Sequence, residues 1–161
     1  STTAFERTDP FSIAFWVKGP VSPSASLTIL AKRAGGAVQA GYRITILGAT
    51  ANDPYEVSLV NDAGFSNMIT AEFSRSNNND WHHVVVTYIG NSLAAGISLS
   101  EAGVSKSRST AGTLTGSILN SAGFQIGVWQ GTQFFPGLID EVRVYKRALS
   151  AAEVSALYQS R

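Results

Sequence analysis

The chain has 161 residues, enough for one domain with a substantial core. Charged residues make up only 14% of it, and the formal net charge is +1. With no Lys/Arg run longer than two, the chain lacks the basic face that duplex binding requires. It also has no Cys, which excludes disulfides and thiolate zinc sites. No apolar run approaches the ~20 residues that span a bilayer. We therefore expect neither a nucleic-acid partner nor membrane insertion.

Short alternating segments, separated by Gly, Pro, Asn and Asp, follow one another along the chain, as in a protein built from strands and turns. In chain order, the predicted strands are 11–18, 27–32, 41–47, 55–60, 66–73, 81–88, 95–100, 113–119, 124–128 and 138–145. The pattern is weakest in 113–119. No helical segments alternate with these strands, which favours an antiparallel sandwich or barrel over a parallel sheet.

One helix is indicated near the end of the chain. Ser150 and Glu153 have the spacing of a capping box, in which each side chain accepts a hydrogen bond from the other residue's backbone N–H. Leu149 precedes the cap and can pack on Val154 as a hydrophobic staple. We expect a single short helix from this point, packed on an end of a sheet.

Four segments resemble a known family. They are 11–18 (FSIAFWVK), 30–32 (LAK), 80–88 (DWHHVVVTY) and 137–150 (GLIDEVRVYKRALS). In order and spacing they are similar to motifs of the laminin-G-like, concanavalin A-like lectin/glucanase jelly roll, over roughly residues 9–158. The resemblance implies an all-β antiparallel jelly-roll sandwich with one short C-terminal helix, and we expect residues 1–161 to form a single domain.

The resemblance also implies that jelly rolls of this kind often hold one structural calcium ion. Calcium prefers carboxylate and carbonyl oxygens. Asp140, in the last strand, is the first candidate ligand, with Glu6 or Asp9 of the N-terminal segment as partners. The alternative is that Asp140 accepts hydrogen bonds from loop amides. Two turns in which the family commonly places acidic residues have none here, at Ile89-Gly90 and in 97–103, apart from Glu101.

No catalytic constellation is evident. A glycosidase needs two carboxylates across the scissile bond, and on one strand these sit at i and i+2 or i+4. Asp140 and Glu141 are adjacent, so they point to opposite faces, and we expect one buried in hydrogen bonds and one exposed. His82 and His83 likewise face opposite ways and cannot jointly chelate a metal. No Gly-x-Ser-x-Gly elbow occurs. We therefore expect no enzyme.

A candidate ligand surface lies in 128–133. Sugars stack on aromatic rings and need directional partners for their hydroxyls, and Trp129, Gln130 and Gln133 supply both kinds of contact. Gly127 and Gly131 flank Trp129, so it is the tryptophan most open to solvent, or else it plugs an end of the sandwich. We expect Trp16 and Trp81 in the core and Phe134–Phe135 covering it. Further candidate ligand-binding residues, on nearby strands and turns, are Tyr42, Arg43, Lys32, Arg33 and Asn61.

Two functions from different classes fit these observations, because the superfamily includes sugar-binding, adhesion, virion and hydrolase members. The leading hypothesis is a non-catalytic recognition module whose partner is a glycan or polysaccharide. The alternative is a structural, adhesion or decoration protein that acts through other protein chains, including copies of itself. Both imply an extracellular, cell-surface or virion location.

Overall fold

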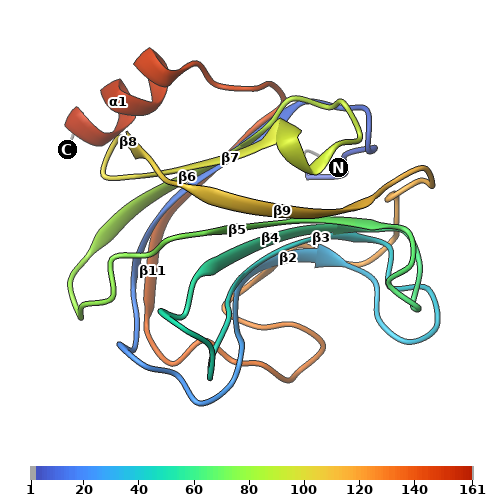
Figure 1. Ribbon diagram of the computed structural model, residues 1–161, viewed down its shortest axis with the longest axis horizontal. Helices are drawn as coiled ribbons and strands as arrows, with labels where there is room; N and C mark the ends of the chain where they lie inside the picture. Colours follow the sequence, from blue (N-terminus) through green and yellow to red (C-terminus); the bar gives the residue numbers. More distant parts are fainter. Residues whose placement is uncertain (1–2, 161) are drawn as a thin grey trace.

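The structure is a computed structural model that describes residues 3–160, and in it two antiparallel sheets stack face to face (Figure 1). Sheet A has the strand order β11-β1-β6-β7-β8, and sheet B has the order β10-β2-β3-β4-β5-β9. The strands of sheet A are β1 Phe11–Lys18, β6 His82–Tyr88, β7 Ile97–Glu101, β8 Val104–Ser105 and β11 Leu138–Tyr145. Those of sheet B are β2 Leu27–Arg33, β3 Gly41–Ile46, β4 Tyr55–Val60, β5 Met68–Phe73, β9 Arg108–Thr113 and β10 Gln125–Ile126. The predicted all-β jelly-roll sandwich is confirmed.

The core lies between the two sheets and follows from the two-residue period of the strands. In β1, Ile13, Phe15 and Val17 point inward and are almost fully buried. Val84 and Val86 of β6 lie beside them, in register with Phe15 and Ile13. Burying each such side chain stabilises the fold by roughly 1.5–3 kcal/mol. The large apolar residues of the alternating segments therefore hold the two sheets together.

The predicted helix is confirmed as α1, Ala151–Gln159. The chain also has a short 3-10 turn, η1 (Ala94–Gly96), just before β7. Both halves of the capping box form: the Glu153 backbone N–H donates to Ser150 Oγ at 3.3 Å, and Ser150 N donates to Glu153 Oε2 at 2.8 Å. Leu149 and Val154 pack together on Ala14 and Val85. The helix therefore covers the outer face of sheet A, rather than an end of a sheet as we expected.

Three aromatic rings extend this packing along the helix. Tyr158 of α1 lies over Trp16 and His83, with ring centroids 6.1 and 6.0 Å apart. Trp16 is thus on the outer face of sheet A, and the prediction that it fills the core between the sheets is wrong. Trp81 is exposed, which contradicts the same prediction for it. Of the two neighbouring phenylalanines, Phe135 covers the core as predicted, whereas Phe134 is exposed.

One predicted strand is wrong and two were missed, the short β8 and β9. Residues 114–119 form no strand, and the neighbouring strand is instead β9, Arg108–Thr113. Every side chain of β9 is exposed, because it is the edge strand of sheet B and pairs only with β5. An edge strand of small polar residues has no apolar alternation, so the periodicity on which the other predictions rest is absent there.

A buried carboxylate fastens the loop 74–81 to the β7–β8 hairpin. Glu101 is 3% exposed. It accepts hydrogen bonds from the backbone N–H of Ser76 at 3.2 Å, from its hydroxyl at 2.6 Å and from the Tyr55 hydroxyl at 3.3 Å. The Lys106 ammonium lies 2.5 Å from it, and His82 Nδ1 lies 3.4 Å away. Every side of this carboxylate is therefore occupied by a donor.

Candidate ligand-binding site

The outer face of sheet B carries a group of polar side chains that could bind a ligand. Because Tyr42 and Ile44 of β3 point into the core, Arg43 points outward. The same alternation places outward-facing side chains on the neighbouring strands, namely Arg33 of β2, Glu56 and Ser58 of β4, and Glu72 of β5. We call this set, together with Trp129, Gln133 and Phe65 from two loops, the sheet B platform.

A tight hairpin holds Trp129 against the platform. The backbones of Trp129 and Thr132 exchange two hydrogen bonds of 3.2 and 3.0 Å. The two residues between them, Gln130 and Gly131, have positive φ values of 54° and 66°, as in the two-residue turns that favour hairpins. Before and after the turn, Gly127 N donates to Ile29 O and Thr28 N donates to Gln133 O, which ties the loop to β2. Trp129 is therefore positioned by backbone hydrogen bonds on both sides.

The Trp129 indole stacks over two guanidinium groups. Its ring centroid lies 4.8 Å from Arg33 Cζ and 4.7 Å from Arg43 Cζ, within the range of cation–π contact. Phe65, from the loop after β4, lies 5.1 Å from the same Arg33 atom. Burial, with a smaller contribution from the charge of Arg43, lowers the pKa of Arg33 to about 10. The two aromatic rings thus fix a pair of cations on sheet B.

Gln133 connects this aromatic cluster to the strands. Its Oε1 accepts from Arg43 Nη1 at 2.8 Å and from Thr28 Oγ1 at 3.1 Å. Arg43 reaches Glu56 only loosely, with Nη2 and Oε1 4.0 Å apart. Burial raises the pKa of Glu56; the charge of Arg43 opposes this rise, and the charge of Glu72 adds to it. The platform therefore has a cationic half on β2 and β3 and an acidic half on β4 and β5.

Some donors and acceptors on the platform have no hydrogen-bond partner among the described residues. Arg43 Nε and Ser58 Oγ are buried and have no hydrogen-bond partner among them. Glu56 and Glu72 lie directly opposite each other on neighbouring strands. The half-buried indole, the Gln133 amide and these carboxylates offer a ring face, donors and acceptors on one face of sheet B, above the two buried groups. Such a surface suits a ligand that carries both apolar faces and hydroxyl groups.

Four of the predicted ligand-binding residues meet on the platform: Trp129, Gln133, Arg33 and Arg43. Gln130 lies exposed at the tip of the hairpin. The platform residues that we did not predict are Phe65, Glu56, Ser58 and Glu72. The alternation of β4 and β5 was already visible in the sequence, so assigning their outward positions would have found the last three.

The other three predicted residues are held elsewhere by structural contacts. Tyr42 points into the core and its hydroxyl donates to Thr3 O at 2.8 Å. The Lys32 ammonium donates to the carbonyls of Asn120 and Ala122, at 3.0 and 2.6 Å, on the side of β2 away from the platform. Asn61 Nδ2 donates to Ser117 O at 2.6 Å. All three therefore fasten segments of the chain to one another.

Of the three residues predicted to hold calcium, Glu6 and Asp9 lie together, since Glu6 N donates to Asp9 Oδ2 at 2.8 Å, and Asp140 lies on β11. Glu6 and Asp9 belong to the segment before β1, and the Glu6 carboxylate accepts from Ser117 Oγ and the Ile118 N–H. Asp140 pairs with Trp16, five residues along β1, or roughly 16 Å from its start. Residues 3–160 contain no cluster of three metal-ligating side chains. The calcium site stays a prediction.

Asp140 and Glu141 lie at an irregularity in β11, where the register with β1 shifts between Ala14 and Trp16. Glu141 has a φ of 49°, as expected of an extra residue in a bulge. Both side chains are exposed, so the expectation that one of them is buried is wrong. Asp140 Oδ1 accepts from the backbone N–H of Glu141 at 2.8 Å.

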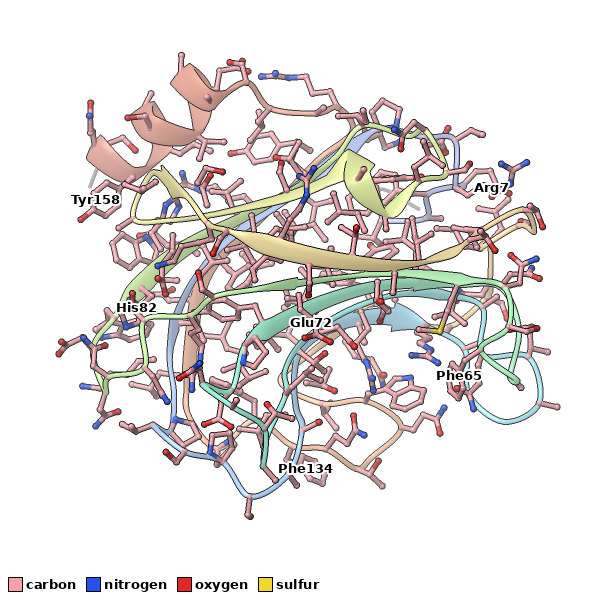
Figure 2. All side chains as sticks on the ribbon, in the orientation of Figure 1. Arg7, Phe65, Glu72, His82, Phe134 and Tyr158 are labelled. Carbon is pink, nitrogen blue, oxygen red and sulfur yellow. The ribbon has the colours of Figure 1, made fainter. Side chains whose placement is uncertain are left out.

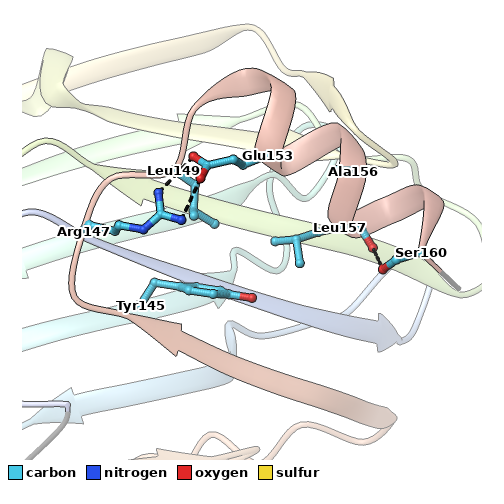
Figure 3. Close-up of a pocket in the computed structure, with 7 residues that line it drawn as sticks. All are labelled: Tyr145, Arg147, Leu149, Glu153, Ala156, Leu157 and Ser160. Atoms are coloured by element: carbon cyan, nitrogen blue, oxygen red, sulfur yellow. Dashed lines mark hydrogen bonds and ion pairs between the residues drawn. The ribbon is translucent and has the colours of Figure 1, made fainter.

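A separate hollow lies beneath α1, on the other side of the sandwich (Figure 3). It has a volume of about 330 Å³ and is lined mainly by the apolar side chains of Leu149 and Leu157 and by the ring of Tyr145. A bidentate ion pair between Arg147 and Glu153, with distances of 2.7 and 2.9 Å, borders it. Figure 2 shows Tyr158 on this side of the molecule, and Glu72 and Phe65 on the side of sheet B.

The geometry of the two sheets agrees with a comparison against protein-family models. Residues 1–155 match the model described as the concanavalin A-like lectin/glucanases superfamily. The chain belongs to this superfamily. The match covers nearly the whole chain, and it includes every strand of both sheets. No curated protein sequence matches the chain.

Solved structures with the superfamily's sandwich resemble the chain at low identity. The binding domain of Paraclostridial Mosquitocidal Protein 1 has a TM-score of 0.69 and 17% identity, over 98% of this chain and 38% of that one. A structure titled for cell entry of botulinum neurotoxin type C through two ganglioside molecules has a TM-score of 0.65 and 19% identity, over 94% and 36%. Domain 4 of AbnA, a GH43 extracellular arabinanase from Geobacillus stearothermophilus, was solved in complex with arabinotriose. It has a TM-score of 0.62 and 21% identity, over 94% and 67%.

These likenesses establish the sandwich fold. The chain spans less than two fifths of the length of either toxin chain. Within residues 3–160, no helix has the length and apolar character needed to cross a membrane.

Proposed function

We propose that this chain is a non-catalytic recognition module that binds a glycan on the sheet B platform. The observation that carries the proposal is the Trp129 indole, held over Arg33 and Arg43 by a hydrogen-bonded hairpin. A positioned aromatic ring offers a sugar an apolar face at little entropic cost, because the hairpin has already ordered it.

The groups around the ring supply the directional contacts that a sugar needs. The Gln133 amide, the Arg43 guanidinium and the Glu56 carboxylate lie next to one another across β2, β3 and β4. Donors and acceptors at fixed positions distinguish one arrangement of hydroxyls from another. The ring would therefore contribute affinity, and the polar groups would contribute selectivity.

The structural neighbours support the same class of function. They are named as toxin binding domains, as a toxin whose cell entry depends on gangliosides, and as a domain in complex with arabinotriose. A glycan-binding role agrees with an extracellular, cell-surface or virion location.

The test is calorimetric titration of the purified chain with a glycan panel that includes arabinotriose and ganglioside oligosaccharides. For a glycan that binds, Trp129→Ala should weaken affinity at least tenfold, since buried Trp side chains are frequent binding hot spots. The matched control is Trp81→Ala, which removes an exposed tryptophan outside the platform and should leave affinity unchanged. The proposal fails if no glycan binds, or if folded Trp129→Ala binds as tightly as the parent chain.

A second candidate is an assembly role through protein contacts. The observation that favours it is β9, a six-residue edge strand whose side chains are all exposed. Such an edge can pair with a strand of another chain. Mass measurement in solution separates the two candidates: a stable trimer or larger oligomer favours assembly, and a monomer favours a recognition module.

A further inference from the structure

The acidic half of the sheet B platform lowers the stability of the fold. Glu56 and Glu72 are directly opposite each other on one face of β4 and β5, where Cβ atoms lie about 4.5–5.5 Å apart. Like charges at this separation destabilise a sheet. Nothing in the core requires them, because both side chains face away from it.

Neither carboxylate is satisfied within the platform. The Glu72 side chain makes no hydrogen bond or ion pair within residues 3–160. Glu56 accepts only a long contact of 3.5 Å from Thr45 Oγ1, and its nearest cation, Arg43, stays 4.0 Å away. Arg43 instead gives its short hydrogen bond to Gln133. The two carboxylates thus retain most of their capacity to accept hydrogen bonds.

A second, independent observation points to a ligand at the same place. Ser58, two residues from Glu56 on the same face, is 1% exposed, and its hydroxyl has no partner among the described residues. Arg43, its neighbour on β3, has an unpartnered Nε. Unsatisfied buried polar groups are rare and call for an explanation. An incoming polar ligand that draws on these groups would supply one.

The charges of the platform indicate which class of ligand this is. Two cations, Arg33 and Arg43, and two carboxylates, Glu56 and Glu72, give a formal net charge of zero. A sugar acid lying across the platform would add a third negative charge beside the acidic pair. Neutral hydroxyls, by contrast, can donate to both carboxylates without such a penalty.

We infer that the ligand of the sheet B platform is a neutral, hydroxyl-rich saccharide, and that Glu56 and Glu72 are the acceptors that select it over acidic sugars. This inference rests on the proposed glycan-binding function. It places the saccharide across the strands, with one unit at Trp129 and the next units over β4 and β5. Trp129 and the acidic pair then both contribute to affinity, and the acidic pair also determines specificity.

The experiment is calorimetric titration with two matched probes, neutral arabino-oligosaccharides and oligogalacturonates of the same length. We expect the parent chain to prefer the neutral probe at least tenfold. Glu72→Gln and Glu56→Gln should each weaken neutral binding by roughly ten- to hundredfold, the effect of losing a hydrogen bond to a charged group. The double variant should also bind oligogalacturonate more tightly than the parent chain, because the repulsion is gone. The control is Glu141→Gln, on sheet A.

The outcomes separate this inference from the function on which it rests. If Trp129→Ala abolishes binding while both glutamate variants keep full affinity, the inference is overturned and the glycan-binding function stands. Tighter binding of oligogalacturonate by the parent chain also overturns the inference alone. Binding of neither probe class, nor of any glycan in the wider panel, refutes both.

Discussion

Replacing Glu101 by Gln tests how much one buried ion pair contributes to the stability of the sandwich. The substitution keeps the size of the side chain but removes its charge. The Lys106 ammonium, 2.5 Å away and 22% exposed, would lose its partner, and the donors of Ser76 and Tyr55 would face a weaker acceptor. Because the carboxylate side chain is only 2% exposed, solvent cannot replace these contacts.

The expected loss of stability is large. Breaking a buried ion pair costs about 3–5 kcal/mol, and we take about 3 kcal/mol because Gln retains an acceptor and Lys106 is partly solvated. Unfolding a chain of this length has an entropy of roughly 0.34 kcal/mol per kelvin. The melting temperature should therefore fall by about 9 °C at pH 7. Glu141→Gln, which removes one partner of an exposed ion pair, should leave it unchanged.

The pH dependence of this effect has a definite sign. Burial alone would raise the pKa of Glu101, but hydrogen bonds from Lys106 and Ser76, with the charges of Lys106 and His82, lower it below the ordinary value. A carboxyl group with a lowered pKa in the folded state contributes stability above its unfolded pKa, and that contribution is lost as the pH falls through the folded pKa. The difference in melting temperature between the parent chain and Glu101→Gln should thus narrow below about pH 4.3.

Thermal denaturation followed by circular dichroism, at pH values from 7 to 3, measures both effects. A difference in melting temperature under 2 °C at pH 7 would show that the network contributes little. A gap that stays constant down to pH 3 would show that the charge of Glu101 is not its source.

Three further substitutions are read by the same assay at pH 7. Glu72→Gln should raise the melting temperature by about 1–3 °C, because it removes a like-charge cross-strand pair worth roughly 0.2–1 kcal/mol; a lower melting temperature would mean that Glu72 has a stabilising partner. Ser150→Ala should lower it by about 3 °C through loss of an N-cap worth ~1 kcal/mol, and an unchanged value would exclude the cap as a stabilising contact. Gly41→Ala should lower the melting temperature more than Ser150→Ala, since φ is 135° and a Cβ atom would meet Lys32 O at 2.1 Å. Wild-type stability would contradict the backbone geometry at this position.

Most of the fold could be predicted because apolar alternation and helix-cap spacing each correspond to one kind of local structure. Alternation of large apolar residues in 11–18 and 82–88 places one face of each strand in the core. The Ser150–Glu153 spacing predicts a helix start, and the cap forms at that residue. β9 could not be predicted, because an exposed edge strand carries no periodic signal. The position of Trp16 could not be predicted either, because the helix that buries it from the outside is more than 130 residues away in sequence.

Only half of the predicted site residues lie on the platform, because the prediction included neighbouring residues that point to opposite faces of a strand. Tyr42 and Arg43 are neighbours on one strand, as are Lys32 and Arg33, so only one member of each pair can reach the platform. Applying the two-residue period would have removed Tyr42 and Lys32. Phe65 and the opposition of Glu56 to Glu72 depend on a loop conformation and on strand register, which local sequence does not specify.

Because α1 packs on sheet A, the two outer faces of the sandwich differ (Figure 1). Trp16 and His83, the aromatic groups on the outer side of sheet A, are already stacked under Tyr158. Among residues 3–160, α1 packs on sheet A and leaves the outer face of sheet B to the platform. A polymer chain bound there would run along the face opposite α1 and would not touch the helix. Substitutions in the Trp129 and Phe65 loops would then change what is recognised without disturbing the packing of α1 on sheet A.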